Sequence, residues 1–230
     1  MTDKNIALLR QVLTPGVWNR VVKLPFAMMT EARQQQQHAP ARAAVTAQLA
    51  VAIGIESVAP IRVGNLTAIQ LGKNLSKPDG PSSNYWLNFP DCDVKNRMKL
   101  VYPLEPYLTQ LIDEYVHDFR PTLLRGRNED CLFPGLRKGS KGEVTFSGQI
   151  TKRISKLTGL RMTAHQFRHA AGAIIHKRYP GNYELVRQIL GHRNVQTTIK
   201  CYIGLDNIRA SEIFSKIVLE HLHEDPEEVE

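Results

Sequence analysis

Residues 190–202 read LGHRNVQTTIKCY, the most informative stretch of the chain. Gly191 directly follows the helical pattern YELVRQIL, and we expect it to close that helix, because glycine adopts left-handed backbone angles without strain. His192 would then stand at a corner between two helices, where a ligand can reach its imidazole. Tyr202 follows ten residues later, across a second short helix.

A second informative stretch, AHQFRHAAG, occupies residues 164–172. His165 and Arg168 are three residues apart and share one face of a helix, with His169 one turn beyond His165. The two histidines have the spacing of a zinc pair, but the metalloprotease helix requires glutamate directly after the first histidine, where Gln166 stands. We therefore predict no metal here and interpret His169 as an ordinary helix residue.

The two stretches together resemble the catalytic domain of tyrosine recombinases, the phage-integrase family. The resemblance runs from about residue 40 to 216 and implies that family's fold, which is α+β and mainly α-helical with a small antiparallel sheet. His165 and Arg168 match the HxxR pair of the family. His192 matches the histidine of its LGH motif, and Tyr202 matches its nucleophile.

Two further family positions can be located by order along the chain. The first arginine of the family precedes the small sheet, and in IESVAPIRVGNLTAIQL Arg62 holds that place. The family's lysine lies in a hairpin turn eight residues before the proline of a closing VPL, and in DVKNRMKLVYPL that count gives Lys95, with Arg97 and Lys99 nearby. The chain departs from the family at Asn65, where an acid usually stands, and we expect the amide to serve partly in its place.

The resemblance implies DNA strand exchange without a metal or cofactor, because protein cations neutralise the charge that builds on the phosphate. Two arginines suit this task, since a guanidinium stays charged and donates paired hydrogen bonds. The implied roles are a phosphate clamp (Arg62, Arg168, His192), a proton acceptor (His165), a proton donor to the leaving 5′ oxygen (Lys95) and a nucleophile that forms a 3′-phosphotyrosyl ester (Tyr202).

Periodicity of apolar residues predicts where the helices and strands lie. Strand-like patterns cover residues 66–72, 84–89 and 98–104, which predicts a small antiparallel sheet. A proline at position 25 should bend or break the first long helix. The expected helices cover residues 17–36, 40–56, 105–119, 146–159, 164–178, 183–190, 194–202 and 207–222, with an irregular basic stretch at 121–142.

The chain of 230 residues is expected to hold one main domain. We assign residues 1–39 to a helical lead-in or the remnant of a linker to a missing DNA-binding domain, 40–216 to the catalytic domain, and 217–230 to the end of a C-terminal helix and an acidic tail. No apolar run approaches the roughly 18 residues of a membrane span, no signal peptide is recognised, and the three cysteines lie far apart. A cytoplasmic protein of a bacterium, a phage or another mobile element fits these features.

Charge indicates a polyanionic partner. The net charge is +8, and six of the 22 acidic residues crowd the last eleven positions, so that 30 basic residues face 16 acidic ones elsewhere. Double-stranded DNA is the expected partner, although an ordinary basic protein would show a similar balance.

One apolar stripe near the C-terminus has two interpretations. It can pack on its own domain, as C-terminal helices commonly do. By resemblance, it can instead dock on a neighbouring protomer and hold a tetramer on DNA, which is the interpretation we favour. The stripe consists of Ile213, Phe214, Ile217, Val218 and Leu222.

The sequence therefore predicts a site-specific DNA recombinase or integrase that cuts and rejoins DNA through Tyr202. The alternative is an inactive or regulatory DNA-binding protein that retains the recombinase fold. A type IB topoisomerase shares the chemistry but usually departs from the LGH motif at His192.

Overall fold

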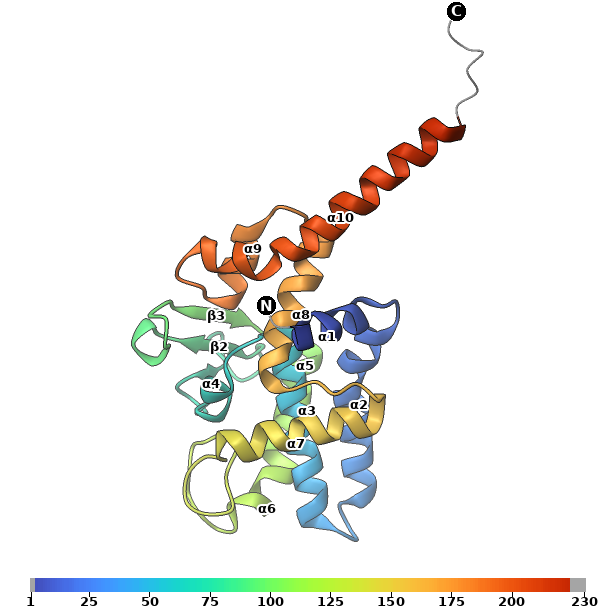
Figure 1. Ribbon diagram of the computed structural model, residues 1–230. Helices are drawn as coiled ribbons and strands as arrows, with labels where there is room; N and C mark the ends of the chain where they lie inside the picture. The colour runs from blue at the N-terminus through green and yellow to red at the C-terminus, as the bar shows by residue number, and fades with distance from the viewer. Residues whose placement is uncertain (1–2, 224–230) are drawn as a thin grey trace, which may run out of the picture.

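The computed structural model describes the backbone of residues 3–223, and the side chains of that range except residues 3, 4, 201, 203–209, 212 and 221–223. Helices make up most of this range, with one small sheet at the edge of the bundle (Figure 1). The helices are α1 (Asp3–Leu13), α2 (Val17–Gln35), α3 (Pro40–Val58), α4 (Val63–Thr67), α5 (Pro106–Glu114), η2 (Tyr115–Phe119), α6 (Arg120–Leu124), α7 (Glu143–Thr158), α8 (Ala164–Arg178), α9 (Tyr183–Leu190) and α10 (Val195–His223), with a short turn η1 (Asp91–Asp93).

Helix α3 is the centre of the fold. Its residues from Ala43 to Glu56 are buried almost without interruption, and it packs against α2, α5, η2, α6, α7 and α8. By length and composition alone α3 could cross a membrane, but 72% of its apolar window is buried inside the fold, as expected of a core helix. Helix α2 packs along α3 and continues through Pro25, so of the bend or break expected there the break does not occur.

The sheet has three antiparallel strands in the order β1 (Leu75–Ser76), β2 (Trp86–Phe89) and β3 (Leu100–Pro103). Leu87 pairs with Tyr102, and both point into the core, whereas the alternate residues of β2 and β3 face outward. This alternation places one face of the sheet on the helical core. The strands expected at 84–89 and 98–104 are confirmed with shifted ends.

The strand predicted at residues 66–72 is wrong. This segment begins inside α4, and only isolated bridges form at Gln70 and Leu71. Leu66 and Ile69 are both fully buried, and their separation of three residues fits a helical turn as well as a strand. The first strand of the sheet begins later, at Leu75.

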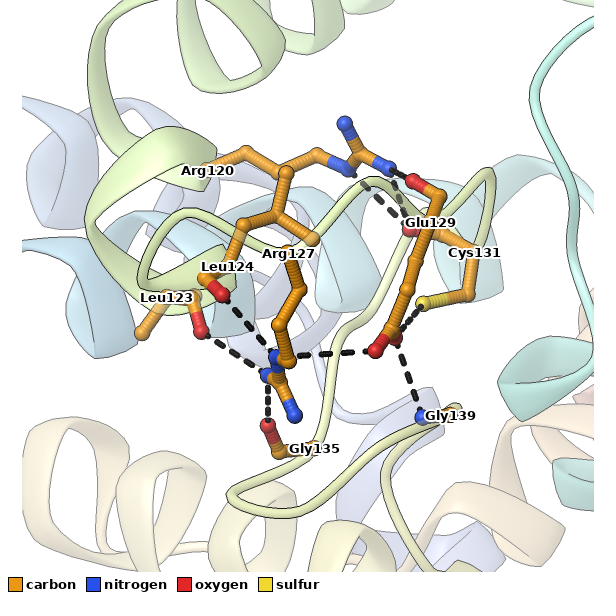
Figure 2. A network of polar contacts seen from close by, with 8 residues as sticks. All are labelled: Arg120, Leu123, Leu124, Arg127, Glu129, Cys131, Gly135 and Gly139. Carbon is orange, nitrogen blue, oxygen red and sulfur yellow. Dashed lines mark hydrogen bonds and ion pairs between the residues drawn. The ribbon is translucent and has the colours of Figure 1, made fainter.

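Polar contacts to the backbone hold the long loop between α6 and α7 (Figure 2). The Arg127 guanidinium donates to the carbonyl oxygen of Gly135 at 2.9 Å, and its Nε lies 3.5 Å from Oε1 of Glu129. Oε2 of Glu129 accepts a hydrogen bond from the backbone N–H of Gly139 at 3.0 Å. These contacts satisfy backbone groups that a loop of this length would otherwise leave unpaired. The irregular stretch starts only after α6, later than predicted.

Helix α8 matches the predicted range of residues 164–178. It begins with a capping box, in which Thr163 and Gln166 each bond the other's backbone N–H. Helix α9 ends at Gly191, whose φ of 58° is left-handed, as predicted. A Cβ atom at Gly191 would lie 2.5 Å from Leu100, so close packing against β3 also requires glycine there.

Helix α10 is one continuous helix of 29 residues, where two helices were predicted. It extends away from the body of the molecule (Figure 1). A single glycine at position 204 costs about 1 kcal/mol in a helix and does not end this one. The apolar stripe is exposed, with Phe214 exposed to 67%, so the interpretation that it packs on its own domain is wrong for residues 213–218. The side chain of Leu222 and the acidic tail lie outside the described residues.

Candidate active site

An open pocket of about 640 Å³ lies at the corner between α9 and α10. Arg62 reaches it from the N-terminus of α4, and His192 reaches it from the corner itself. Arg187 and Arg193 add positive charge to its wall, and Glu184 pairs with Arg187 at 2.6 Å. Within the described part of the chain, no group accepts a hydrogen bond from the Arg62 guanidinium. The pocket therefore presents an uncommitted cation to an anionic ligand.

Arg168 is buried and does not line this pocket. Its two terminal nitrogens donate to the carbonyl oxygens of Pro60 and Leu190, each at 2.5 Å. One guanidinium thus ties the α3–α4 connection to the end of α9. Burial, followed by the nearby charge of Arg62, lowers the pKa of Arg168 from its usual value. This electrostatic effect means that Arg62 and Arg168, both predicted from the sequence, lie close together.

His192 is held by a hydrogen bond of 2.9 Å between its Nδ1 and the hydroxyl of Thr198 in α10. Its backbone carbonyl accepts a hydrogen bond from Arg187 at 2.9 Å. Burial and the positive charges of Arg168 and Arg62 lower the pKa of His192 to about 4. His192 is therefore neutral near pH 7, with its Nε2 left to contact a ligand.

His165 stands in the first turn of α8 and is half-buried. Burial, then Arg168, then Arg62 lower the pKa of its imidazole. It is therefore unprotonated near pH 7, the form that can accept a proton. Its ring lies edge-on to that of His169, with centroids 5.1 Å apart and planes at 89°.

Tyr202 is 1% exposed and does not line the pocket. Its hydroxyl lies 3.4 Å from the backbone carbonyl of Arg168, and its ring packs in a cluster with Leu9 and Leu190. A Cβ atom at Gly172 would lie 1.9 Å from the tyrosine oxygen, so the absence of a side chain in α8 makes room for the ring. Tyr202 is thus next to the site, but its hydroxyl faces the backbone of α8.

These features have parallels among known proteins. The chain matches the model of the phage integrase family over residues 27–208. The chain belongs to the phage integrase family. The match includes all six predicted site residues. They lie before α4 (Arg62), in the turn between β2 and β3 (Lys95), on α8 (His165, Arg168), in the corner between α9 and α10 (His192) and on α10 (Tyr202).

Individual relatives of this family are distant. Tyrosine recombinase XerD of Yersinia pestis is 30% identical over 118 residues, which cover 50% of this chain and 38% of XerD. Transposase A from transposon Tn554 of Staphylococcus aureus (strain N315) is 26% identical over 135 residues, which cover 56% of this chain and 36% of the transposase. The chain thus matches well under half the length of these curated relatives.

Solved structures show the fold of the family. XerH bound to a palindromic difH substrate in a post-cleavage complex has a TM-score of 0.60 and 19% identity over 84% of this chain and 51% of XerH. XerA recombinase has a TM-score of 0.52 and 17% identity over 89% of this chain and 64% of XerA. The phage integrase fold of this chain is therefore that of tyrosine recombinase catalytic domains.

The structure does not bring Lys95 into the pocket. Lys95 is exposed in the turn between β2 and β3, and no described residue forms a hydrogen bond or ion pair with it. Its neighbour Asn96 lines the pocket and donates to the carbonyl oxygen of Gly191 at 3.0 Å, which ties the turn to the corner. Arg97 and Lys99 are also exposed in this turn, so geometry leaves the choice among the three cations open.

At position 65, where the family usually has an acid, the chain has the amide of Asn65. The Asn65 side-chain nitrogen is buried and has no hydrogen-bond partner among the described groups. A different acid, Glu56 of α3, is 1% exposed, and its charge acts on Arg168. Burial raises the pKa of Glu56 well above its usual value, while Arg168 opposes that rise. Sequence reasoning missed Glu56 because no local pattern marks it.

Further residues contact the site histidines, and the sequence analysis did not identify them as site residues. Thr198 could have been noticed within the TT pair of LGHRNVQTTIKCY, and Gln166 as the third residue of a capping box after Thr163. Asn5 of α1 contacts His169 and Gln166, and no sequence signal links these positions. Among the described side chains, no group of three His, Cys, Asp or Glu residues is arranged to hold a metal ion.

Proposed function

We propose that this protein is a site-specific DNA recombinase that cleaves and rejoins DNA through a phosphotyrosyl intermediate on Tyr202. The observation that carries the proposal is the convergence of Arg62, Arg168, His165 and His192 beside the helix that bears Tyr202. The catalytic domain would span residues 40–216, after a helical lead-in at 1–39. It would act on DNA in the cytoplasm, and it would belong to a bacterium, a phage or another mobile element.

The reaction follows from the chemistry of the groups present. Arg62 and Arg168 would donate to the non-bridging oxygens of one phosphate, and His192 would add a third donor. The Tyr202 oxygen would attack phosphorus and form a P–O bond as the bond to the 5′ oxygen breaks. His165 would accept the phenolic proton, and Lys95 would supply one to the departing 5′ oxygen.

The ester bond to Tyr202 conserves the energy of the broken phosphodiester. Attack by a 5′ hydroxyl from the same or another strand would form a new phosphodiester and release the tyrosine. The same proton transfers run in reverse during this second step. Cutting and joining therefore need no outside energy source.

Tyr202 would have to leave its buried position before it can attack. Its hydroxyl now faces the carbonyl of Arg168 rather than the pocket that Arg62 and His192 line. Its contact with the Arg168 carbonyl oxygen is long at 3.4 Å. Leaving would also expose the ring, which now packs with Leu9 and lies against Gly172.

Double-stranded DNA is the partner that the charges favour. A groove of about 720 Å³ runs along α7 and carries Lys152, Lys156 and Arg161. Together with the arginines of the pocket, these cations would contact successive phosphates, and binding would weaken steeply with salt. Crystal structures of XerH, which has a similar fold, contain its difH substrate, and this supports a DNA partner for the chain.

The exposed stripe of α10 would dock on a neighbouring protomer and hold a tetramer on DNA. Ile213, Phe214 and Ile217 are 48%, 67% and 43% exposed on a helix that extends from the body (Figure 1). Contiguous apolar side chains of this kind mark interaction surfaces. Removing the chain after Asp206 should abolish DNA-dependent assembly, and unchanged assembly would refute this role.

A plasmid assay tests the proposed activity. Supercoiled plasmid is incubated with the protein in EDTA and quenched with detergent, and the wild type is compared with Tyr202→Phe. Relaxed plasmid and protein-linked DNA are expected for the wild type alone. Equal activity in both proteins would contradict the role of Tyr202.

A regulatory DNA-binding protein is the second candidate function. The burial of Tyr202 favours it, because a hydroxyl that never leaves α8 cannot attack a phosphate. This candidate predicts DNA binding with a strong salt dependence but no protein-linked DNA in either protein of the plasmid assay.

A further inference from the structure

Helix α1 packs against α8, and the contacts follow the same order along both helices. Asn5 contacts His169 and Gln166 at one end, and Leu9 packs with Ala173 in the middle. At the other end, Lys177 donates to a backbone carbonyl of α1 at 3.2 Å. The N-terminal helix therefore lies on the helix that bears His165 and Arg168.

A chain of hydrogen bonds fixes the polarity of these contacts. The backbone N–H of Thr163 can only donate, and it donates to the Gln166 side chain at 2.9 Å. That atom must be Oε1, which makes the other end of the Gln166 amide the donor Nε2. The donor lies 3.1 Å from Asn5, which must therefore present Oδ1 to it.

The remaining end of Asn5 decides the state of His169. Because Oδ1 faces Gln166, the atom of Asn5 that lies 3.3 Å from His169 Nε2 is the donor Nδ2. A donor opposite Nε2 requires that this nitrogen carry no proton. His169 is therefore neutral, with its proton on Nδ1.

We propose that Asn5 is a positioning residue of this site, which holds His169 neutral and so keeps a third positive charge away from His165. The proposal rests on the proposed function, in which His165 accepts the proton of Tyr202. It gives His169, interpreted from the sequence as an ordinary helix residue, a part in the site.

The distance shows why the charge of His169 matters. The rings of His165 and His169 are 5.1 Å apart. A cation at that distance would weaken His165 as a base by on the order of 100-fold at an effective dielectric constant of about 20. Arg62 and Arg168 already lower the pKa of His165, so a further cation would leave it with little capacity to accept a proton.

The charged surroundings of His169 agree with this role. Burial lowers the pKa of His169 to about 4, together with the charges of His165, Arg168 and the chain's amino terminus. His169 in turn acts on His192 at the α9–α10 corner. The other charged or titratable side chains near α8 act on Arg168 or lie in the groove along α7. They include Glu56 of α3, Tyr102 of β3, Tyr202 of α10, Lys152 and Lys156 of α7, and Arg161 after α7. On α1, the charged side chain that the structure describes is Arg10, which is exposed.

Nuclear magnetic resonance of the full chain with ¹⁵N-labelled histidine tests the contact of Asn5 with His169 without requiring activity. In the wild type, His169 is expected to show an unprotonated Nε2 and a protonated Nδ1 from pH 7 to pH 5. Asn5→Leu removes the donor opposite Nε2, so part of the His169 proton should move from Nδ1 to Nε2. Lys177→Met is the matched control, because it removes the other polar contact between α1 and α8 and should leave His169 unchanged.

Asn5→Asp provides a second variant of nearly the same shape, which preserves folding if leucine does not. Its carboxylate still accepts from Gln166 but places an acceptor opposite His169, so Nε2 should become protonated. A protonated Nε2 in the wild type, or an unprotonated Nε2 in Asn5→Asp, would overturn the proposal.

A pH profile of DNA cleavage tests whether the contact of Asn5 with His169 affects the reaction. Asn5→Asp is expected to cleave more slowly than the wild type below pH 7, because its carboxylate favours the protonated form of His169. Adding His169→Phe to Asn5→Asp should remove that loss, because phenylalanine does not titrate. The same loss in both variants would overturn the role of His169. A wild type that forms no link to DNA at any pH would refute the proposed function instead. The resonance of His169 would still show whether Asn5 fixes its protonation.

Discussion

Replacing Gly172 with alanine should disturb the buried position of Tyr202 specifically. The new Cβ atom would lie 1.9 Å from the Tyr202 oxygen and 2.3 Å from Cζ, so the ring must move. Overpacking of a core typically costs about 1–3 kcal/mol, and loss of the hydroxyl's buried contact costs about 1 kcal/mol more. Gly148→Ala is the matched control, because Gly148 also lies within a helix but has open space around it.

Both substitutions gain about 1 kcal/mol in helix propensity, so that gain cancels in the comparison. Gly172→Ala should therefore be about 2–4 kcal/mol less stable than Gly148→Ala, which corresponds to a Tm roughly 5–15 °C lower for a domain of this size. Thermal unfolding monitored by circular dichroism measures this difference. Equal Tm values for the two variants would refute the conclusion that Gly172 makes room for Tyr202.

The same pair of variants tests whether burial restrains the nucleophile. Because the ring must leave its cluster before it attacks, Gly172→Ala should form protein-linked DNA about 10-fold faster than Gly148→Ala for each 1.4 kcal/mol removed from the buried state. The assay uses a nicked duplex that traps the covalent product, at a temperature where both variants are folded. Identical trapping rates would contradict a restraining role for the burial of Tyr202.

Three further predictions concern charge and assembly. Arg168→Lys should lower the cleavage rate on the order of 100-fold or more while duplex binding persists, because lysine cannot donate the paired hydrogen bonds of the clamp; an unchanged single-turnover rate would rule out that role. Burial and nearby cations lower the folded-state pKa of His165, His169 and His192. The free energy of unfolding should therefore have its full value above about pH 6.5 and fall as the pH drops toward 4, because the unfolded chain binds protons more readily than the folded one. A urea midpoint that is the same at pH 7 and pH 5 would be inconsistent with this. Phe214→Asp should prevent assembly on DNA in sedimentation experiments but change the unfolding free energy by less than about 0.5 kcal/mol, because this side chain is 67% exposed; assembly equal to the wild type would remove the stripe from the interface.

The parts of the fold that local chemistry specifies could be predicted from the sequence. Helix α8 was predicted with its observed ends, because its apolar pattern is regular and Pro180 follows its last turn. The end of α9 at Gly191 follows from the left-handed conformation that glycine adopts there. The pattern at 66–72 was ambiguous, because Leu66 and Ile69 are spaced for a helical turn and also belong to an apolar run.

The long-range features of the site could not be predicted in the same way. The sequence order led to Arg62, Arg168 and His192, which the structure brings together, but order says nothing about the direction in which a side chain points. The burial of Tyr202 depends on contacts with α1 and α8, which are distant in sequence. The contact of Asn5 with His169 spans 164 residues and has no local signature.

Identification of the amino acid that carries DNA tests the central claim most directly. The full chain is incubated with a nicked duplex in EDTA, digested with a protease and a nuclease, and its peptides are examined by mass spectrometry. The account predicts a nucleotide attached through a 3′ phosphate to the peptide that contains Tyr202, and none in Tyr202→Phe. A nucleotide on another residue, or no adduct from a wild type that binds the duplex, would contradict it.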